Sequence, residues 1–189
     1  MNLIDPTQSV LVLVDYQQRL LPAMHRGADV LAEAVRIADV ARELGIPVFG
    51  TEQSPQGLGP NDDAIRQRCD ATMSKTHFDA CADGLLDLLA GVDTAADSGA
   101  DANARREIVI AGCEAHVCVL QTALGLLRAG RKVHVIAQAS GSRKPEDHEW
   151  AMRRLRQAGA DIVSVEMVAF EWLRSCKHER FKPVLTLLK

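Results

Sequence analysis

Aromatic residues are scarce in this 189-residue chain, and no excess of basic residues compensates for them. Phe, Trp and Tyr make up 4% of the residues, and 22 Lys and Arg stand against 25 Asp and Glu, for a formal net charge of -3. Proteins that bind nucleic acid combine a basic patch or groove with, for single strands, aromatic platforms on which bases stack. The composition therefore argues against a dedicated nucleic-acid-binding protein.

Long apolar runs and disulfide-type cysteine patterns are also missing. No stretch approaches the ~20 apolar residues of a membrane-spanning helix, and no charged segment followed by an apolar one opens the chain. The five cysteines include no CxxC pair, so we predict free thiols in a reducing compartment. We expect no membrane association and a cytoplasmic location; a mitochondrial location after removal of a leader is the alternative.

What the chain does have is a regular alternation of apolar strands and amphipathic helices, with 47% apolar residues. This pattern predicts one α/β domain over residues 1–189, a three-layer αβα sandwich around a parallel sheet. We predict strands at residues 9–15, 46–51, 71–75, 107–112, 132–137 and 161–165. We predict helices from about residue 30 to 44, at 84–90, 117–129 and 145–158, and in two C-terminal stretches. Residues 52–63 are predicted as a loop, and residues 91–106, which lack apolar periodicity, as an exposed insertion.

Three reactive side chains follow predicted strands: Asp15, Lys75 and Cys118. Ligands of open α/β sheets bind at the carboxyl ends of the strands, so these residues are expected to meet there. Cys118 also opens a predicted helix, where the helix dipole and a nearby ammonium would favour the thiolate, and a carboxylate could accept its proton. The trio predicts an activated cysteine nucleophile.

Three sequence blocks carry a resemblance to a known family. They are Val14–Gln17, Ser74–Phe78 and, most specifically, Ala111–Leu124, which reads AGCEAHVCVLQTAL. These blocks resemble the signature segments of the isochorismatase-like cysteine hydrolases, and the likeness covers essentially the whole chain. Thr51–Gly59 and the segment from Val133 to Arg143 look most like the isochorismatase domain-containing subgroup.

The resemblance implies a fold, a set of roles and an assembly. The fold would be a six-stranded parallel sheet ordered 3-2-1-4-5-6. Asp15 would be the general base, Lys75 the electrostatic partner and Cys118 the nucleophile that forms a covalent intermediate. A cis peptide at Cys113–Glu114 would let the backbone N–H groups of Glu114 and Cys118 form an oxyanion hole. Relatives associate, and the apolar stretch Phe181–Leu188 would suit an interface, so we expect a homo-oligomer, with folding back onto the domain as the alternative for that stretch.

Each candidate residue also has a plainer interpretation. A cysteine in the first turn of a helix is commonly a buried apolar residue, an aspartate at a strand end commonly caps a loop, and a lysine is commonly solvated. The block around Cys118 favours catalysis. Gln17, Gln53, Phe78 and His116 are candidates for lining the pocket, as is His77. Cys113 is predicted to pack and shape the turn, and the remaining cysteines are predicted to be inert: Cys69, Cys81 and Cys176.

The chain departs from its metal-dependent relatives in two places. Nicotinamidase relatives place Asp and His ligands in the loop after the second strand, but this loop offers Glu52 and the neutral Gln53, with no histidine before Arg68. We therefore expect no catalytic metal and no cofactor, and nicotinamide is a doubtful substrate. Gln138 stands where relatives often have Asp after the fifth strand, a change with no evident consequence.

The hypothesis that follows is a cysteine hydrolase that acts on a small molecule through an amide or related C–N bond. Two alternatives stay open: a ligand-binding or scaffold protein without turnover, and a ribonuclease. The hydrolase hypothesis predicts that Cys118 is the thiol most readily alkylated at neutral pH. It also predicts that a carboxylate oxygen of Asp15 and the ammonium of Lys75 lie roughly 3 to 4.5 Å from the sulfur, at the mouth of a cleft.

Overall fold

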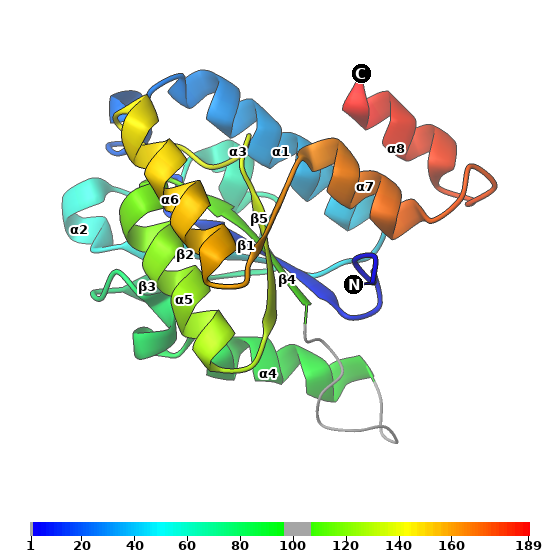
Figure 1. The fold of residues 1–189 in the computed structure, drawn as a ribbon, viewed down its shortest axis with the longest axis horizontal. Helices are drawn as coiled ribbons and strands as arrows, with labels where there is room; N and C mark the ends of the chain where they lie inside the picture. The colour runs from blue at the N-terminus through cyan, green and yellow to red at the C-terminus, as the bar shows by residue number, and fades with distance from the viewer. Residues whose placement is uncertain (1, 97–106) are drawn as a thin grey trace.

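Six parallel strands form the central layer of the protein (Figure 1). The computed structural model describes residues 2–96 and 107–189. The strands are β1 (Ser9–Val14), β2 (Val48–Gln53), β3 (Ala71–Lys75), β4 (Glu107–Gly112), β5 (Lys132–Ile136) and β6 (Asp161–Val163). Their order is β3-β2-β1-β4-β5-β6, which confirms the predicted order and places the reversal of strand order between β1 and β4.

The central strands are apolar throughout because helices cover both faces of the sheet. All six residues of β1 and all six of β4 are buried, as expected for parallel strands with two covered faces. Side chains from alternate positions of these strands enter two separate hydrophobic cores, one on each face. The three-layer sandwich predicted from the sequence is therefore the observed architecture.

Three long helices cover each face of the sheet (Figure 1). One face carries α1 (Gly27–Glu43), α7 (Val165–Leu173) and α8 (Phe181–Leu188). The other carries α4 (Leu85–Ala96), α5 (Leu120–Arg128) and α6 (Pro145–Gln157). Shorter elements are η1 (Leu21–Ala23), α2 (Pro55–Leu58), α3 (Asp63–Arg66), the 3-10 turn η2 (Ala80–Asp83) and the π-helical turn η3 (Ala115–Val119). Within the described part of the chain, no helix is both long and apolar enough to cross a bilayer.

The structure corrects several predicted boundaries. β2 runs from Val48 to Gln53 and not over 46–51, so Glu52 and Gln53 belong to the strand and not to the predicted loop. Residues 91–96, predicted as the start of an exposed insertion, continue α4 to Ala96; Ala, Asp and Thr are compatible with a helix even where no apolar stripe marks one. The rest of the predicted insertion, residues 97–106, lies outside the described residues. The predicted loop at 52–63 contains the one-turn helix α2, which begins at Pro55, a favoured first helical residue.

The C-terminal apolar stretch folds back onto its own domain. Helix α8 packs against α1 and α7, with Val184 fully buried and Phe181, Leu187 and Leu188 packed against the core. Of the two outcomes that the sequence left open, the structure supports folding back, so this stretch no longer argues for a subunit interface.

Candidate functional site

Asp15 lies immediately after β1 at the carboxyl edge of the sheet, and its carboxylate is completely buried. Its backbone takes the left-handed conformation, with φ of 56°, which is uncommon for a residue other than glycine. The Asp15 N–H donates to the Thr51 carbonyl (3.1 Å), and the Thr51 hydroxyl donates to Oδ1 (2.7 Å). A strained backbone that the surroundings hold in place is typical of functional sites.

Lys75 is the last residue of β3, and its ammonium group is buried beside Asp15. Nζ lies 2.8 Å from Oδ2 of Asp15, and neither side chain is exposed to solvent. Nζ also donates to Oε1 of Gln53 (2.6 Å) and lies 3.4 Å from the carbonyl oxygen of His77. A buried lysine needs such compensation because burial without partners penalises the charged form. The structure thus brings together Asp15 and Lys75, which lie on strands separated by β2.

Cys118 follows β4, the neighbour of β1 on the side opposite to β2 and β3. Asp15 and Lys75 are close enough to its side chain to shift the pKa of the thiol, and 4% of the residue is exposed, so only a small part of its surface meets solvent. The nucleophile candidate therefore lies near both predicted partners, although the three residues are distant in sequence. This juxtaposition is the one that the parallel topology predicted.

The protonation of Cys118 differs from the prediction. Burial, followed by the negative charge of Asp15, raises the pKa of the Cys118 thiol to about 12, whereas the ammonium of Lys75 lowers it. The residue also lies in the π-helical turn η3 and not in the first turn of α5, so the predicted helix over 117–129 begins as a different kind of turn. The resting state is a thiol, and Cys118 is no longer expected to be the thiol most readily alkylated at neutral pH.

The turn before Cys118 is made by a left-handed residue and not by a cis peptide. The described chain contains no cis peptide bond, so the prediction for Cys113–Glu114 is wrong. Glu114 instead has φ of 55° and reverses the chain directly after β4 and Cys113. The Ala115 N–H then donates to the Gly141 carbonyl (2.7 Å), which holds the turn. The prediction that the Glu114 and Cys118 N–H groups form an oxyanion hole depended on the cis peptide. The trans peptide removes that support.

Two features fix this turn on the sheet. A Cβ atom at Gly112 would collide with the carbonyl oxygen of Val14, so the close approach of β4 to β1 requires glycine. Oε1 of Glu114 pairs with Nε of Arg143 (2.6 Å), and Oε2 lies 3.3 Å from Nδ1 of His116. The Arg143–Glu114 pair, which the sequence did not predict, ties the segment after β5 to the turn that carries the nucleophile.

The four predicted pocket residues divide into supporting and exposed ones. Gln17 is fully buried, and its amide exchanges two hydrogen bonds with the backbone of Gln53 (3.0 and 2.8 Å). Gln53 contacts Lys75 directly. His116 is bound by Ser142 (3.0 Å between Nδ1 and Oγ), and Phe78 is half exposed. Gln17 and Gln53 therefore support the site.

Thr51 is the residue that the sequence did not single out. It lies near the carboxyl end of β2, paired in register with Val14, and its hydroxyl binds Asp15. A threonine in an otherwise apolar buried strand, next to a strand that ends on an aspartate, is the signal that could have identified it.

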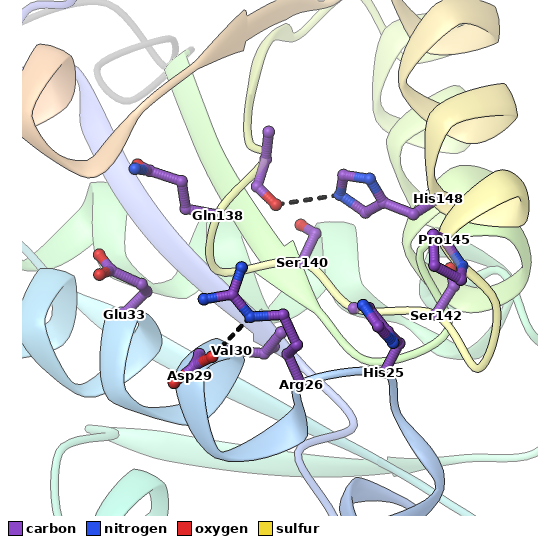
Figure 2. A pocket seen from close by; sticks show the side chains of 12 residues that line it. His25, Arg26, Asp29, Val30, Glu33, Gln138, Ser140, Ser142, Pro145 and His148 are labelled. Carbon is purple, nitrogen blue, oxygen red and sulfur yellow. Dashed lines mark hydrogen bonds and ion pairs between the residues drawn. The ribbon is translucent and has the colours of Figure 1, made fainter.

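A cavity of about 340 Å³, which none of Asp15, Lys75 and Cys118 lines, lies at the carboxyl end of β5 (Figure 2). It is enclosed by the start of α1, the segment after β5 and the first turns of α6. Nε of Arg26 binds Asp29 (2.7 Å), and the His148 ring is directed at the Ala137 carbonyl (3.0 Å). Ser142 lines the cavity and also binds His116, so one hydrogen bond links the cavity to the turn that carries the nucleophile.

Glu52, predicted in the loop after the second strand, lies within β2, and its carboxylate has a structural role. Oε1 of Glu52 accepts a hydrogen bond from the Asn61 N–H (2.8 Å) and thereby closes the loop. Across the described ranges 2–96 and 107–189, no group of three or more His, Cys, Asp or Glu side chains could hold a metal ion. Glu52 therefore has a structural partner at the position where metal-dependent relatives have a ligand.

Comparison with known proteins identifies the family. The model of the isochorismatase domain matches residues 9–167. The isochorismatase domain-containing protein 2A of Mus musculus is 30% identical over 184 residues, which cover 97% of this chain and 84% of the mouse protein. The isochorismatase domain-containing protein 2 of Bos taurus is 34% identical over 185 residues, with coverage of 97% and 84%.

A solved structure agrees in fold. The structure of the MAR1 ribonuclease from Caenorhabditis elegans superimposes with a TM-score of 0.87 at 31% identity, covering 98% of this chain and 91% of the other. Both the sequence likeness and the sheet order extend over the strands that carry Asp15, Lys75 and Cys118. The chain belongs to the isochorismatase-like hydrolase family.

Proposed function

We propose that the protein is a cysteine hydrolase that cleaves an amide or related C–N bond of a small molecule through a covalent intermediate on Cys118. The observation that carries the proposal is the place of the Cys118 thiol, near enough to a buried Asp15–Lys75 pair for both charges to act on it. Burying a charged pair costs free energy and adds little net stability. A buried pair beside a thiol therefore favours a catalytic role over a structural one.

The protonation state assigns the roles. Because the pKa of Cys118 is about 12, the thiol reaches the thiolate only as its proton leaves for a base. The Asp15 carboxylate is the base within reach. As the sulfur adds to the carbonyl carbon, Asp15 takes the thiol proton, and Lys75 stabilises the negative charge that develops near it.

The cycle closes with the same groups. Collapse of the tetrahedral intermediate breaks the C–N bond, and protonated Asp15 returns its proton to the leaving nitrogen, which leaves a thioester on Cys118. Asp15 then takes a proton from water as the water oxygen adds to the thioester carbon. The acid product leaves, and the sulfur regains its proton from Asp15. The Cys118 N–H, in the π-helical turn η3 that precedes α5, is the backbone donor that we assign to the oxyanion.

A panel of amides, imides and esters, with mass spectrometry of the quenched enzyme, tests this function. We expect one substrate class to add an acyl mass to the peptide that contains Cys118, and Cys118→Ala to lose both the adduct and turnover. Cys176→Ala, at an exposed cysteine, is the matched control and should behave as wild type. Turnover that survives in Cys118→Ala would refute the proposal.

We also propose that catalysis needs no metal, because Glu52 is engaged with Asn61 and its neighbour Gln53 is neutral. Activity should therefore survive EDTA. Loss of activity on chelation, with recovery on addition of zinc, would contradict this part of the proposal.

Ribonuclease activity is the second candidate function, because the 31% identical relative from C. elegans is named a ribonuclease. The net charge of -3 and the low aromatic content argue against it. A gel assay that compares wild type with Cys118→Ala on RNA decides the matter: cleavage by both proteins indicates a contaminant, and cleavage by wild type alone supports the ribonuclease. A scaffold without turnover is disfavoured because all three reactive residues are present and lie close together.

We propose that the protein forms a homo-oligomer. Helix α8 offers no interface, but several large apolar side chains remain exposed on the single chain: Leu3, Phe78, Trp150, Met167 and Phe170. Leu3 and Met167 line the same surface pocket, and apolar side chains that gather in this way mark surfaces that a partner covers. Light scattering that gives 20.6 kDa, the mass of one chain, at micromolar concentration would contradict the proposal.

A further inference from the structure

We propose that Gln53 is a positioning residue that sets the rotation of the Lys75 ammonium and directs one of its N–H groups at Cys118. This inference rests on the proposed function in one respect: the thiolate is taken to be the nucleophile that attacks the substrate. An ammonium group has three N–H donors at tetrahedral angles. Two of them are directed at Oε1 of Gln53 at 2.6 Å and at the carbonyl oxygen of His77 at 3.4 Å. With two donors directed in this way, the third is left for the side of Asp15, whose Oδ2 lies 2.8 Å from Nζ, and of Cys118, whose thiol the ammonium influences.

The orientation of the Gln53 amide follows from its other contact. Its Nε2 lies 2.8 Å from the carbonyl oxygen of Thr76, which can only accept a hydrogen bond. The NH2 end of the amide must therefore face Thr76, and the oxygen end must face Lys75. Gln53 also pairs with Lys75 in the register of β2 and β3, so the backbone brings the two side chains to the same place.

A second glutamine holds the first. Nε2 of Gln17 donates to the Gln53 carbonyl (3.0 Å), and Oε1 of Gln17 accepts from the Gln53 N–H (2.8 Å). Nε2 of Gln17 donates in addition to the carbonyl of Gly59 (2.6 Å). The segment after β1 thus fixes the end of β2, and Gln53 has little freedom to move away from Lys75.

The neutral charge of Gln53 is part of the arrangement. A carboxylate at this position would share the single ammonium with Asp15 and would place a second negative charge near the sulfur. Like charges in one site disfavour each other's ionised form, and they would disfavour the thiolate too. An amide accepts the hydrogen bond without that charge. Without the Gln53 acceptor, only the longer hydrogen bond to the His77 carbonyl (3.4 Å) would restrain the ammonium, which could then rotate away from Cys118.

The rate at which iodoacetamide alkylates Cys118, followed by peptide mass from pH 6.5 to 9.5, measures thiolate stability without a substrate. Gln53→Met fills the space but removes the acceptor, and we expect Cys118 to react about tenfold more slowly than in wild type at every pH. Gln53→Glu is the conservative variant. When protonated, the introduced carboxyl group accepts from Lys75 and donates to Thr76, so the rate should match wild type at low pH and fall behind it as that carboxyl group ionises.

Gln157→Glu makes the same chemical change at the exposed last residue of α6. The alkylation rate of Cys118 in this control should equal that of wild type at every pH. Thermal unfolding of each variant identifies any that fails to fold; Gln53→Glu at low pH still tests the proposal if Gln53→Met fails. Cys118 reactivity equal to wild type in folded Gln53→Met, or a pH-independent ratio for Gln53→Glu, would overturn the proposal. A substrate panel without turnover would count against the hydrolase and leave the alkylation result standing.

Discussion

Two buried clusters of ionisable side chains lie at opposite edges of the same sheet. At the carboxyl edge, the side chains of Asp15 and Lys75 are fully buried and lie close enough to Cys118 to shift its pKa. At the amino edge, the buried His134 lies between Glu107 and Asp161, 3.9 and 3.3 Å from their carboxylate oxygens. Both clusters bury charge, but only the first has no member in open contact with water.

The difference shows what separates a reactive cluster from a structural one. Glu107 is paired with Lys132, whose side chain is 60% exposed, so water shares the stabilisation of that charge. Asp15 and Lys75 are compensated by each other and by the neutral side chains of Gln53 and Thr51. Burial of a titratable group is therefore insufficient evidence for a site. A nucleophile, a strained backbone and charges compensated within the protein together make the stronger case.

The largest expected effect is on stability at the carboxyl edge. Lys75→Met leaves Asp15 buried without its cation, and breaking a buried pair in this way costs about 3–5 kcal/mol. Lys132→Met makes the same substitution at the amino edge, where the cation is exposed, and should cost about 1 kcal/mol or less. Denaturant unfolding of both variants measures the two costs.

The double variant Asp15→Asn/Lys75→Met sharpens this test. Removal of both charges should recover much of the loss, because no unpaired charge stays buried. Equal destabilisation by Lys75→Met and Lys132→Met would remove the distinction between the two edges.

The second effect is on the reactivity of Cys118. Because its pKa is about 12, the thiolate fraction should rise about tenfold per pH unit, and the rate of alkylation about a hundredfold from pH 7 to pH 9. Iodoacetamide labelling followed by peptide mass gives the profile. A rate that levels off by pH 8 would mean that the carboxyl edge stabilises the thiolate after all.

The third effect concerns the hydroxyl that binds Asp15. Thr51→Val keeps the shape of the side chain but removes the donor to Oδ1, and loss of a buried hydrogen bond to a charged group costs about 2 kcal/mol. Thr186→Val removes an exposed hydroxyl in α8, which bonds to the Lys182 carbonyl, and should cost far less. Chemical unfolding of the two variants compares them, and equal costs would show that Asp15 does not depend on Thr51.

The smallest effect is a pH dependence at the amino edge. Burial, the largest cause, lowers the pKa of His134 below 6.5, against the opposing charges of Asp161, Glu107 and Glu171. The unfolded chain therefore takes up this proton first as the pH falls, and the folded protein loses stability below about pH 6.5. The unfolding free energy of wild type should fall more between pH 8 and pH 5 than that of His134→Gln. Parallel curves would show that His134 titrates normally.

Prediction from sequence was most successful where a local pattern decides the structure. The bounds of β3 and β4 match the predicted strands, and β1 ends at Val14, one residue before the predicted end at Asp15. It was least successful where the environment decides, as in the helical extension to Ala96, the trans peptide at Glu114 and the protonation of Cys118. Periodicity reports which face of an element is apolar, and it carries no information on how strongly a given group is desolvated.

The sequence by itself determined the alternation of strands and helices. It thereby determined the edge of the sheet at which Asp15, Lys75 and Cys118 meet, because parallel strands bring their carboxyl ends to one side. Only the tertiary structure decided what those residues do to each other. The complete burial of Asp15 and Lys75, the orientation of Gln53 toward Lys75 and the raised pKa of Cys118 depend on side chains that meet across strands. Desolvation and hydrogen-bond geometry are properties of that assembled environment, and no single segment of the chain contains them.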